Sequence, residues 1–248
     1  MTTSNNNPLY IVIEGVNGSG KSTLAEGLKE YMCSFCKSVE IFGEPDGRSI
    51  AGKRVREWLS EEVPIPPESL QEGMTWARLY SMLCLRVNHR AGIDTIVERS
   101  WLSSAIYGMM EGLSPFQICL KQKHILKDSY VIPDLMILVD IPPEEADRRI
   151  ALRPTPRRRF DNLESITKAC EIYKEIWTGA LFAEEDMLLP GKERWLVVNG
   201  CLPVAGNVKL ASSHIQQIWA GIPWLQQWGG MPTAKRRSVL SSSPKTFS

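Results

Sequence analysis

The stretch Gly15-Val16-Asn17-Gly18-Ser19-Gly20-Lys21-Ser22 decides the fold that this sequence predicts. It matches the pattern G-x-x-x-x-G-K-[ST], in which a glycine-rich loop directs backbone N–H groups at phosphate oxygens beside a helix N-terminus. The context fits, because the β-branched segment Leu9–Ile13 predicts a buried strand before the loop, and Lys21 to about Met32 predicts a helix after it. The sequence therefore predicts a loop that binds a nucleoside triphosphate.

Side chains of this loop have separate predicted roles. Lys21 is expected to reach the β- and γ-phosphates, and the Ser22 hydroxyl is expected to bind Mg²⁺. The expected cofactors are accordingly ATP and Mg²⁺. The predicted nucleotide-binding residues are Gly15, Val16, Asn17, Gly18, Ser19, Gly20, Lys21, Ser22 and Thr23.

Short apolar segments alternate with amphipathic segments along most of the chain. The predicted strands are Leu9–Ile13, Ser38–Phe42, Asp94–Val97, Leu135–Ile141 and Trp195–Val198. Helices are expected at 21–32, 50–59, 66–89, 100–110 and 115–126, from Pro142-Pro143 onward, and at 204–220. This alternation predicts an α/β fold with a five-stranded parallel sheet covered by helices on both faces. We expect one domain over residues 1–222 and a largely disordered Gly/Pro/Ser/basic tail over 223–248.

Composition excludes several classes of partner. The chain has 29 Lys and Arg residues against 28 Asp and Glu residues, a balance that does not favour binding to nucleic acid or to acidic membranes. No apolar run approaches the roughly 20 residues of a membrane span. Six cysteines in 248 residues are too few for a disulfide scaffold, and Met1 to Pro8 does not resemble a secretory signal. A cytoplasmic protein is expected, with a nuclear location as the alternative if Lys235-Arg236-Arg237 is a targeting signal.

Polar side chains follow several of the predicted strands, where a second substrate of a small kinase would lie. Glu44-Pro45-Asp46-Gly47 follows the second strand, and Glu98-Arg99-Ser100 follows the third. Met74 and Arg78 share one face of the long predicted helix, because they are four residues apart. The segment Arg153-Pro154-Thr155-Pro156-Arg157-Arg158-Arg159-Phe160-Asp161 predicts a short arginine-rich lid.

In these motifs the sequence resembles the thymidylate kinase family over roughly residues 9 to 220. The family's I-E-G opening is present as Ile13-Glu14-Gly15, its E-P-G-G-T loop as Glu44-Pro45-Asp46-Gly47-Arg48, and its lid ending D-R-F-E as Arg158-Arg159-Phe160-Asp161. Further matches are Arg78 at the family's spacing before Glu98-Arg99, Ser103 through Tyr107, Pro133-Asp134-Leu135, and Trp195 through Gly200. The resemblance implies a P-loop kinase fold, phosphorylation of dTMP by ATP, and a possible homodimer.

The resemblance also implies site residues. Arg99 would hold the acceptor phosphate and Arg78 would read the base. Because the phosphate loop lacks an arginine, lid arginines would reach the transferred phosphoryl group. The expected catalytic residues are Lys21, Arg99, Glu44, Arg153, Arg157 and Arg159, with Arg158 as a further lid candidate. The expected substrate-binding residues are Glu44, Arg48, Met74, Arg78, Glu98, Arg99, Ser103 and Tyr107.

Some residues depart from the family pattern and leave alternatives open. Asn17 replaces a carboxylate, Gly43 stands where many relatives have an arginine, and Met74 replaces a phenylalanine that stacks on thymine. Arg48 is the predicted substitute for the arginine that is absent at Gly43. The triplet Glu98-Arg99-Ser100 resembles deoxynucleoside kinases, in which Glu44 would be the general base on a thymidine or deoxycytidine hydroxyl. A nucleotide-binding regulatory module is the alternative outside the enzymes.

Overall fold

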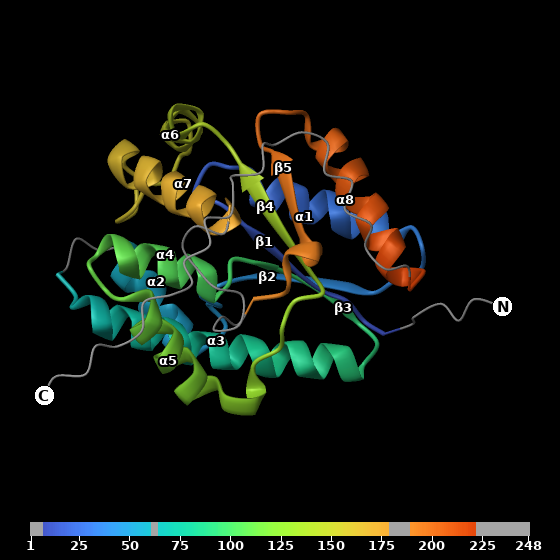
Figure 1. Cartoon of the computed structure of the whole chain (residues 1–248), viewed down its shortest axis with the longest axis horizontal. Coiled ribbons are helices and arrows are strands. Elements are labelled where there is room, and N and C mark those ends of the chain that lie inside the picture. The colour runs from blue at the N-terminus through green and yellow to red at the C-terminus, as the bar shows by residue number, and fades with distance from the viewer. Residues whose placement is uncertain (1–6, 61–63, 179–188, 222–248) are drawn as a thin grey trace, which may run out of the picture.

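The fold is a single parallel sheet between two layers of helices (Figure 1). The computed structural model describes residues 7–60, 64–178 and 189–221. The strands are β1 (Tyr10–Glu14), β2 (Val39–Gly43), β3 (Asp94–Glu98), β4 (Leu135–Asp140) and β5 (Trp195–Asn199). Their order in the sheet is β2-β3-β1-β4-β5, and each neighbouring pair is parallel. The predicted five-stranded parallel sheet is confirmed.

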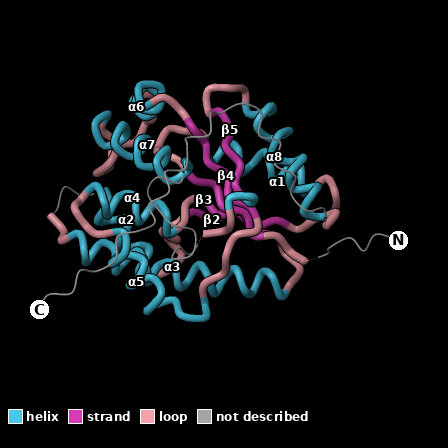
Figure 2. Tube along the Cα trace, in the orientation of Figure 1, coloured by secondary structure: helices cyan, strands magenta, loops and turns pink. Residues whose placement is uncertain are grey.

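Alternate residues of the central strand point to opposite faces of the sheet, and each face has its own helices. The helices are α1 (Lys21–Cys33), α2 (Ile50–Ser60), α3 (Pro67–Arg90), α4 (Trp101–Met110), α5 (Pro115–Leu126), α6 (Pro143–Ala151), α7 (Leu163–Thr178) and α8 (Val204–Trp219). Ile11 and Ile13 pack with α1 and α8, whereas Tyr10 and Val12 pack with α3, α4, α6 and α7. Figure 2 shows the strands enclosed between these two sets of helices.

Helix α7 is the one long element among the described residues that was not predicted from the sequence. Its buried residues Ile166, Ala169, Ile172, Tyr173 and Ile176 recur at helical spacing, so the signal was present. The helix follows directly on the arginine-rich lid segment. Its buried face completes the core over β4 and β5.

The parallel order brings the loops after β1, β2 and β3 to one edge of the sheet, where ligands bind in open α/β sheets. These loops carry the phosphate-binding motif, Glu44 and Arg99. The predicted tail, residues 223–248, lies outside the described residues, and the boundary at residue 222 stays a prediction.

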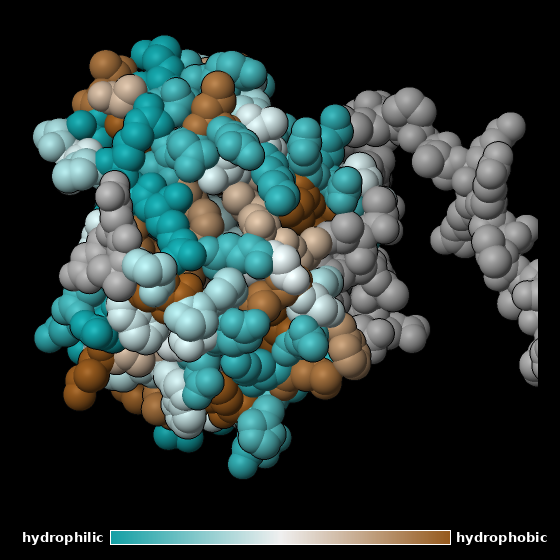
Figure 3. Space-filling model, turned by 90° about the vertical axis from the view of Figure 1, so that its left-hand side faces the viewer, coloured by the Kyte–Doolittle hydropathy of each residue, from teal (hydrophilic) through white to brown (hydrophobic). Residues whose placement is uncertain are grey.

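Within the described ranges, none of the helices has the length and apolar character that crossing a membrane requires. Figure 3 shows the face on the α2, α5 and α7 side, where hydrophilic residues and smaller hydrophobic areas are interspersed.

Candidate active site

The phosphate-binding loop has a backbone shape that requires glycine at particular positions. Gly15, Gly18 and Gly20 have φ values of 141°, 83° and 99°. A Cβ atom on Gly18 would lie 2.4 Å from the carbonyl oxygen of Ala146, and one on Gly15 would lie 2.7 Å from that of Val139. The loop therefore packs directly against the end of β4 and against α6, and only glycine leaves room for this approach.

Lys21 is buried at the start of α1, and its amine contacts a backbone oxygen that a phosphate oxygen could replace. Its Nζ donates a hydrogen bond to the carbonyl oxygen of Val16 at 2.7 Å, across the loop. Burial and the nearby Arg99 guanidinium hold the pKa of Lys21 well below its usual value. Phosphate oxygens bound inside the loop would supply the negative charge that stabilises the protonated form of this amine. The buried Ser19 hydroxyl has no hydrogen-bond partner among the described residues.

Oxygen donors suited to Mg²⁺ lie at the end of the loop. The Ser22 hydroxyl donates to Oε2 of Glu98 at 2.7 Å, which brings the predicted metal ligand beside a carboxylate at the end of β3. No cluster of three or more metal-ligating His, Cys, Asp or Glu side chains occurs in the part of the chain that the structure describes. Such a site would therefore depend on phosphate oxygens and water for its remaining ligands, which is how Mg²⁺ is commonly held beside nucleotides.

Two cavities meet beside this loop. The loop cavity, of about 640 Å³, is lined by the phosphate-binding loop, Gly43, Glu98, Arg149 and Arg153. The inner cavity, of about 430 Å³, extends between α2, α3 and α4 and has a size typical of small-molecule sites. The residues that line both cavities are Asn17, Glu44, Arg56, Arg99 and Arg158. The guanidinium groups of Arg56, Arg99 and Arg158 therefore lie where the two cavities meet, a place that we call the junction.

A buried ion pair forms the polar end of the inner cavity. Nε of Arg78 lies 2.6 Å from Oε2 of Glu44, and both side chains are 3% exposed. Burial raises the pKa of Glu44, although the Arg78 guanidinium opposes that rise. Nη2 of Arg78 donates to Oγ of Ser104 at 3.0 Å. Oε1 of Glu44 and Nη1 of Arg78 are buried and have no hydrogen-bond partner among the described residues.

Arg99 occupies the junction with its position fixed by several contacts. It donates to the carbonyl oxygen of Gly15 at 3.2 Å, to Oγ of Ser103 at 3.0 Å and to Oδ1 of Asn17 at 2.6 Å. Its guanidinium also lies over the ring of Tyr107. The backbone of Arg99 has φ 75°, a conformation that costs a non-glycine residue about 1–3 kcal/mol and concentrates at functional sites.

The apolar wall of the inner cavity includes two further predicted residues. Met74 on α3 accepts a hydrogen bond from the Ser104 hydroxyl at its sulfur, at 3.3 Å. The ring of Tyr107 stacks on Phe160 with a centroid separation of 4.6 Å. Phe160 comes from the lid, so the lid contributes an aromatic side chain to this cavity that the sequence reading gave no role.

The predicted lid arginines separate into two groups. Arg153 lines the loop cavity, Arg158 lines both cavities, and Arg159 lines the inner cavity while pairing with Glu111 at 2.6 Å. Arg157 instead pairs with Asp147 and donates to the backbone oxygen of Asp161. Its guanidinium therefore binds the lid to α6 and is absent from the residues that line either cavity.

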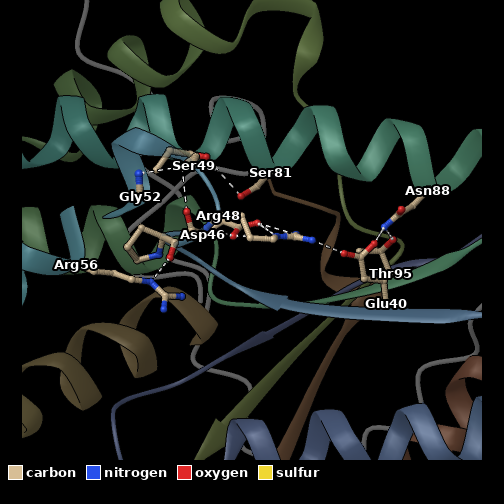
Figure 4. Close-up of polar contacts among 11 residues, drawn as sticks. Glu40, Asp46, Arg48, Ser49, Gly52, Arg56, Ser81, Asn88 and Thr95 are labelled. Carbon is tan, nitrogen blue, oxygen red and sulfur yellow. Dashed lines mark hydrogen bonds and ion pairs between the residues drawn. The ribbon is translucent and has the colours of Figure 1, made fainter. Parts of the chain in front are cut away.

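Arg48 lies away from the cavities where it is expected from the sequence, and Arg56, for which no role was expected, lines them (Figure 4). The guanidinium of Arg48 pairs with Asp46 at 2.7 Å and with Glu40 at 2.6 Å, and Arg48 lines neither cavity. Arg56 of α2 donates to the carbonyl oxygen of Pro45 at 2.7 Å and lines both cavities. Of these two arginines, Arg56 of α2 is therefore the one at the junction. The helical pattern of α2 resembles that of a surface helix and gave no signal for this role.

A buried carboxylate behind Arg99 was also missed. Glu14 is fully buried and accepts hydrogen bonds from the Ser100 backbone N–H and from the hydroxyls of Ser100, Ser103 and Tyr173, each at 2.7 Å. Since Ser103 also accepts from Arg99, this network connects β1, α4 and α7 behind the junction. A glutamate in an otherwise apolar strand was its available signal.

Comparisons with known proteins identify the family to which the chain is similar. The family model described as thymidylate kinase matches residues 13–187. A thymidylate kinase of Leptospira interrogans is 30% identical over 176 residues, covering 69% of this chain and 83% of that protein. One of Chlamydia caviae is 33% identical over 151 residues (57% and 70%), and one of Chlamydia felis is 28% identical over 210 residues (81% and 93%). The family model covers more than half of the chain, and the matched residues include the phosphate loop, Arg99 and the lid. The chain therefore belongs to the thymidylate kinase family.

Proposed function

We propose that this protein transfers the γ-phosphoryl group of ATP to dTMP and forms ADP and dTDP. The observation that carries the proposal is the junction of the two cavities, where Arg56, Arg99 and Arg158 converge. A nucleoside monophosphate brings a second anion to these arginines beside the triphosphate, whereas a nucleoside has no phosphate for them to bind. The membership of the family supports the same reaction.

The loop cavity suits the triphosphate of ATP, and the inner cavity suits dTMP. Lys21 and the backbone N–H groups of the loop would bind the β- and γ-phosphates. In the inner cavity, Glu44 and Arg78 line the polar end that would take the base, and Met74 offers the base an apolar surface. The phosphate of dTMP would then lie at the junction, directed at the triphosphate.

Phosphoryl transfer requires mainly alignment and the neutralisation of charge. An oxygen of the dTMP phosphate forms a bond to the γ-phosphorus while the bond from that phosphorus to the bridging oxygen of ADP breaks, and ADP leaves. Two unit charges 4 Å apart repel by about 4 kcal/mol at an effective dielectric of 20. Lys21, Arg99 and Arg158 offset this repulsion at the point where the phosphates approach. Mg²⁺, when held at Ser22, would neutralise further phosphate charge.

The deoxynucleoside kinase alternative has less support. It requires Glu44 to remove a proton from a sugar hydroxyl, but Arg78 holds that carboxylate in a buried ion pair. The relatives reported above are all thymidylate kinases, so the comparisons offer nothing in its favour.

The test is to incubate the purified protein with Mg·ATP and either dTMP or thymidine and to separate the nucleotides by chromatography. Formation of dTDP from dTMP with thymidine unchanged is the expected result. Formation of dTMP from thymidine would overturn the proposal and make Glu44 the candidate base. Consumption of neither acceptor would favour the regulatory module.

Arg56→Ala is expected to lower kcat/KM for dTMP by about tenfold or more, because it removes a cation from the junction. Arg48→Ala is expected to cost less than about fivefold, since Arg48 pairs with Glu40 and Asp46 and lines neither cavity. Steady-state kinetics with dTMP as the varied substrate measure both changes. Arg54→Ala is the matched control, because Arg54 lies on the same helix and pairs with Glu57 at the surface. Equal losses for Arg48→Ala and Arg56→Ala would return the phosphate-binding role to Arg48.

We also propose that the enzyme forms a homodimer and acts in the cytoplasm. The exposed apolar side chains Trp76, Leu83 and Val87 follow one face of α3 and would suit a second copy of the chain. Light scattering after size exclusion tests this, with a monomer mass as the contrary result.

The six cysteines are free thiols, which suits the reducing environment of the cytoplasm. The basic segment of the nuclear alternative lies outside the described residues.

A further inference from the structure

Asn17 connects three segments that are distant in the sequence. Its Oδ1 accepts a hydrogen bond from Nη2 of Arg99 at 2.6 Å, and its Nδ2 donates one to Oδ1 of Asp161 at 2.6 Å. Asn17 belongs to the phosphate-binding loop, Arg99 follows β3, and Asp161 ends the lid segment, residues 153–161. The amide also lines both cavities, so this connection lies at the place where the two substrates would meet.

An asparagine fits between these two partners in a way that an aspartate does not. The amide offers an acceptor to the guanidinium and a donor to the carboxylate, whereas an aspartate offers acceptors alone. An aspartate here would still bind Arg99, but it would place a second negative charge against Asp161, which is buried. The family resemblance expects a carboxylate at this position, so the contact with Asp161 depends on the departure in this chain.

Asp161 in turn fixes the shape of the lid segment. Its Oδ2 accepts from the backbone N–H of Arg158 at 3.0 Å, and its backbone oxygen accepts from Arg157. Arg158 lines both cavities, and Phe160 lines the inner cavity. The position of Asp161 therefore determines where the lid places its cation and its aromatic ring.

We propose that Asn17 is a positioning residue that couples the lid to Arg99. Its amide holds the lid segment against the phosphate-binding loop and, through the same side chain, orients the guanidinium that would hold the acceptor phosphate. Closure of the lid and alignment of Arg99 are then one event. This inference rests on the proposed phosphorylation of dTMP.

The test is a reciprocal exchange of the two side chains. Asn17→Asp is expected to lower kcat/KM for dTMP by about 10- to 100-fold, since it leaves two carboxylates in contact at a partly buried position. Asp161→Asn is expected to lower it less, because two amides can still form a hydrogen bond. The double variant Asn17→Asp/Asp161→Asn restores an amide–carboxylate contact with the two groups exchanged, and the amide oxygen in the lid would still accept from the Arg158 backbone N–H. Its kcat/KM is expected within about threefold of the wild type.

Asn162→Asp is the matched control, because it adds the same negative charge at the residue that follows Asp161. Its side-chain oxygen accepts from the Ser165 backbone N–H, a role that aspartate retains, and no change in kcat/KM is expected. An Asn17→Asp variant as active as the wild type would overturn the inference. So would a double variant that shows the product of the two single losses.

A readout without substrates separates this inference from the proposed function. Hydrogen–deuterium exchange of the ligand-free protein is expected to become faster over the lid segment in Asn17→Asp and to return to the wild-type rate in the double variant. Unchanged lid exchange in Asn17→Asp would contradict the coupling even if dTMP proved not to be the acceptor. A wild-type protein that fails to phosphorylate dTMP, with the exchange pattern as expected, would overturn the function alone.

Discussion

Lys21→Ala is expected to lower kcat for dTDP formation by roughly 10²- to 10³-fold, the loss that follows removal of one group directed at developing transition-state charge. The amine is buried, lies 2.7 Å from the Val16 carbonyl oxygen and faces the loop cavity. Alanine leaves the loop backbone intact but removes the positive charge that would follow the γ-phosphoryl group. The measurement is the rate of dTDP formation at saturating ATP and dTMP.

The buried position of Lys21 separates this effect from a loss of folding. Burial already opposes its charge and lowers its pKa, so removing the amine is not expected to destabilise the folded chain. Thermal unfolding of Lys21→Ala should therefore occur at or above the wild-type temperature. Lys29→Ala on the same helix is the control, because Lys29 lines neither cavity, and its turnover should match the wild type. Unaltered turnover in Lys21→Ala would remove the phosphate-loop assignment itself.

The sequence was most informative where a residue's role depends on its near neighbours. The glycines of the phosphate loop, the strand before it and the helix after it lie within one short segment, and the structure has them as predicted. The strand predicted over Leu135–Ile141 from its apolar run is observed over Leu135–Asp140, one residue shorter. Local backbone geometry and burial decide these features, and both leave a pattern in the adjacent residues.

Side-chain direction could not be predicted in the same way. Arg48 and Arg56 are both basic and both close to Glu44 in the sequence, but the acidic side chains of Asp46 and Glu40 turn Arg48 away from the cavities. Glu40 belongs to β2 and is itself held by Asn88 of α3 at 2.6 Å (Figure 4). Such a competition between tertiary partners is settled only when the elements pack.

Contacts between distant segments were out of reach for the same reason. Asn17 and Asp161 are 144 residues apart, and Glu14 and Tyr173 are 159 residues apart. Each pair consists of ordinary polar residues with no pattern of their own. The sequence indicated that Asn17 departs from the family pattern. It gave no sign of the contact with Asp161 of the lid, on which the effect of that departure depends.

Arg99→Ala is expected to lower kcat/KM for dTMP by about 10- to 100-fold, the range for losing a hydrogen bond to a charged group. Arg99 is held at the junction by Gly15, Ser103 and Asn17, so its charge is already placed for a phosphate before that phosphate arrives. Removing the guanidinium leaves the acceptor phosphate to approach ATP without that counter-charge. Steady-state kinetics with dTMP varied give the loss.

The acceptor itself supplies the decisive comparison for Arg99. Binding of thymidine, measured by ligand-induced thermal shift, should change little in Arg99→Ala, because thymidine has no phosphate, whereas binding of dTMP should weaken strongly. Equal losses for the two ligands would mean that Arg99 shapes the cavity and does not bind the phosphate. Arg99→Lys keeps the charge but lacks the planar set of donors that contacts three oxygen atoms at once. Its dTMP affinity should therefore lie between those of the wild type and Arg99→Ala, since both the charge and its fixed direction contribute to holding the phosphate.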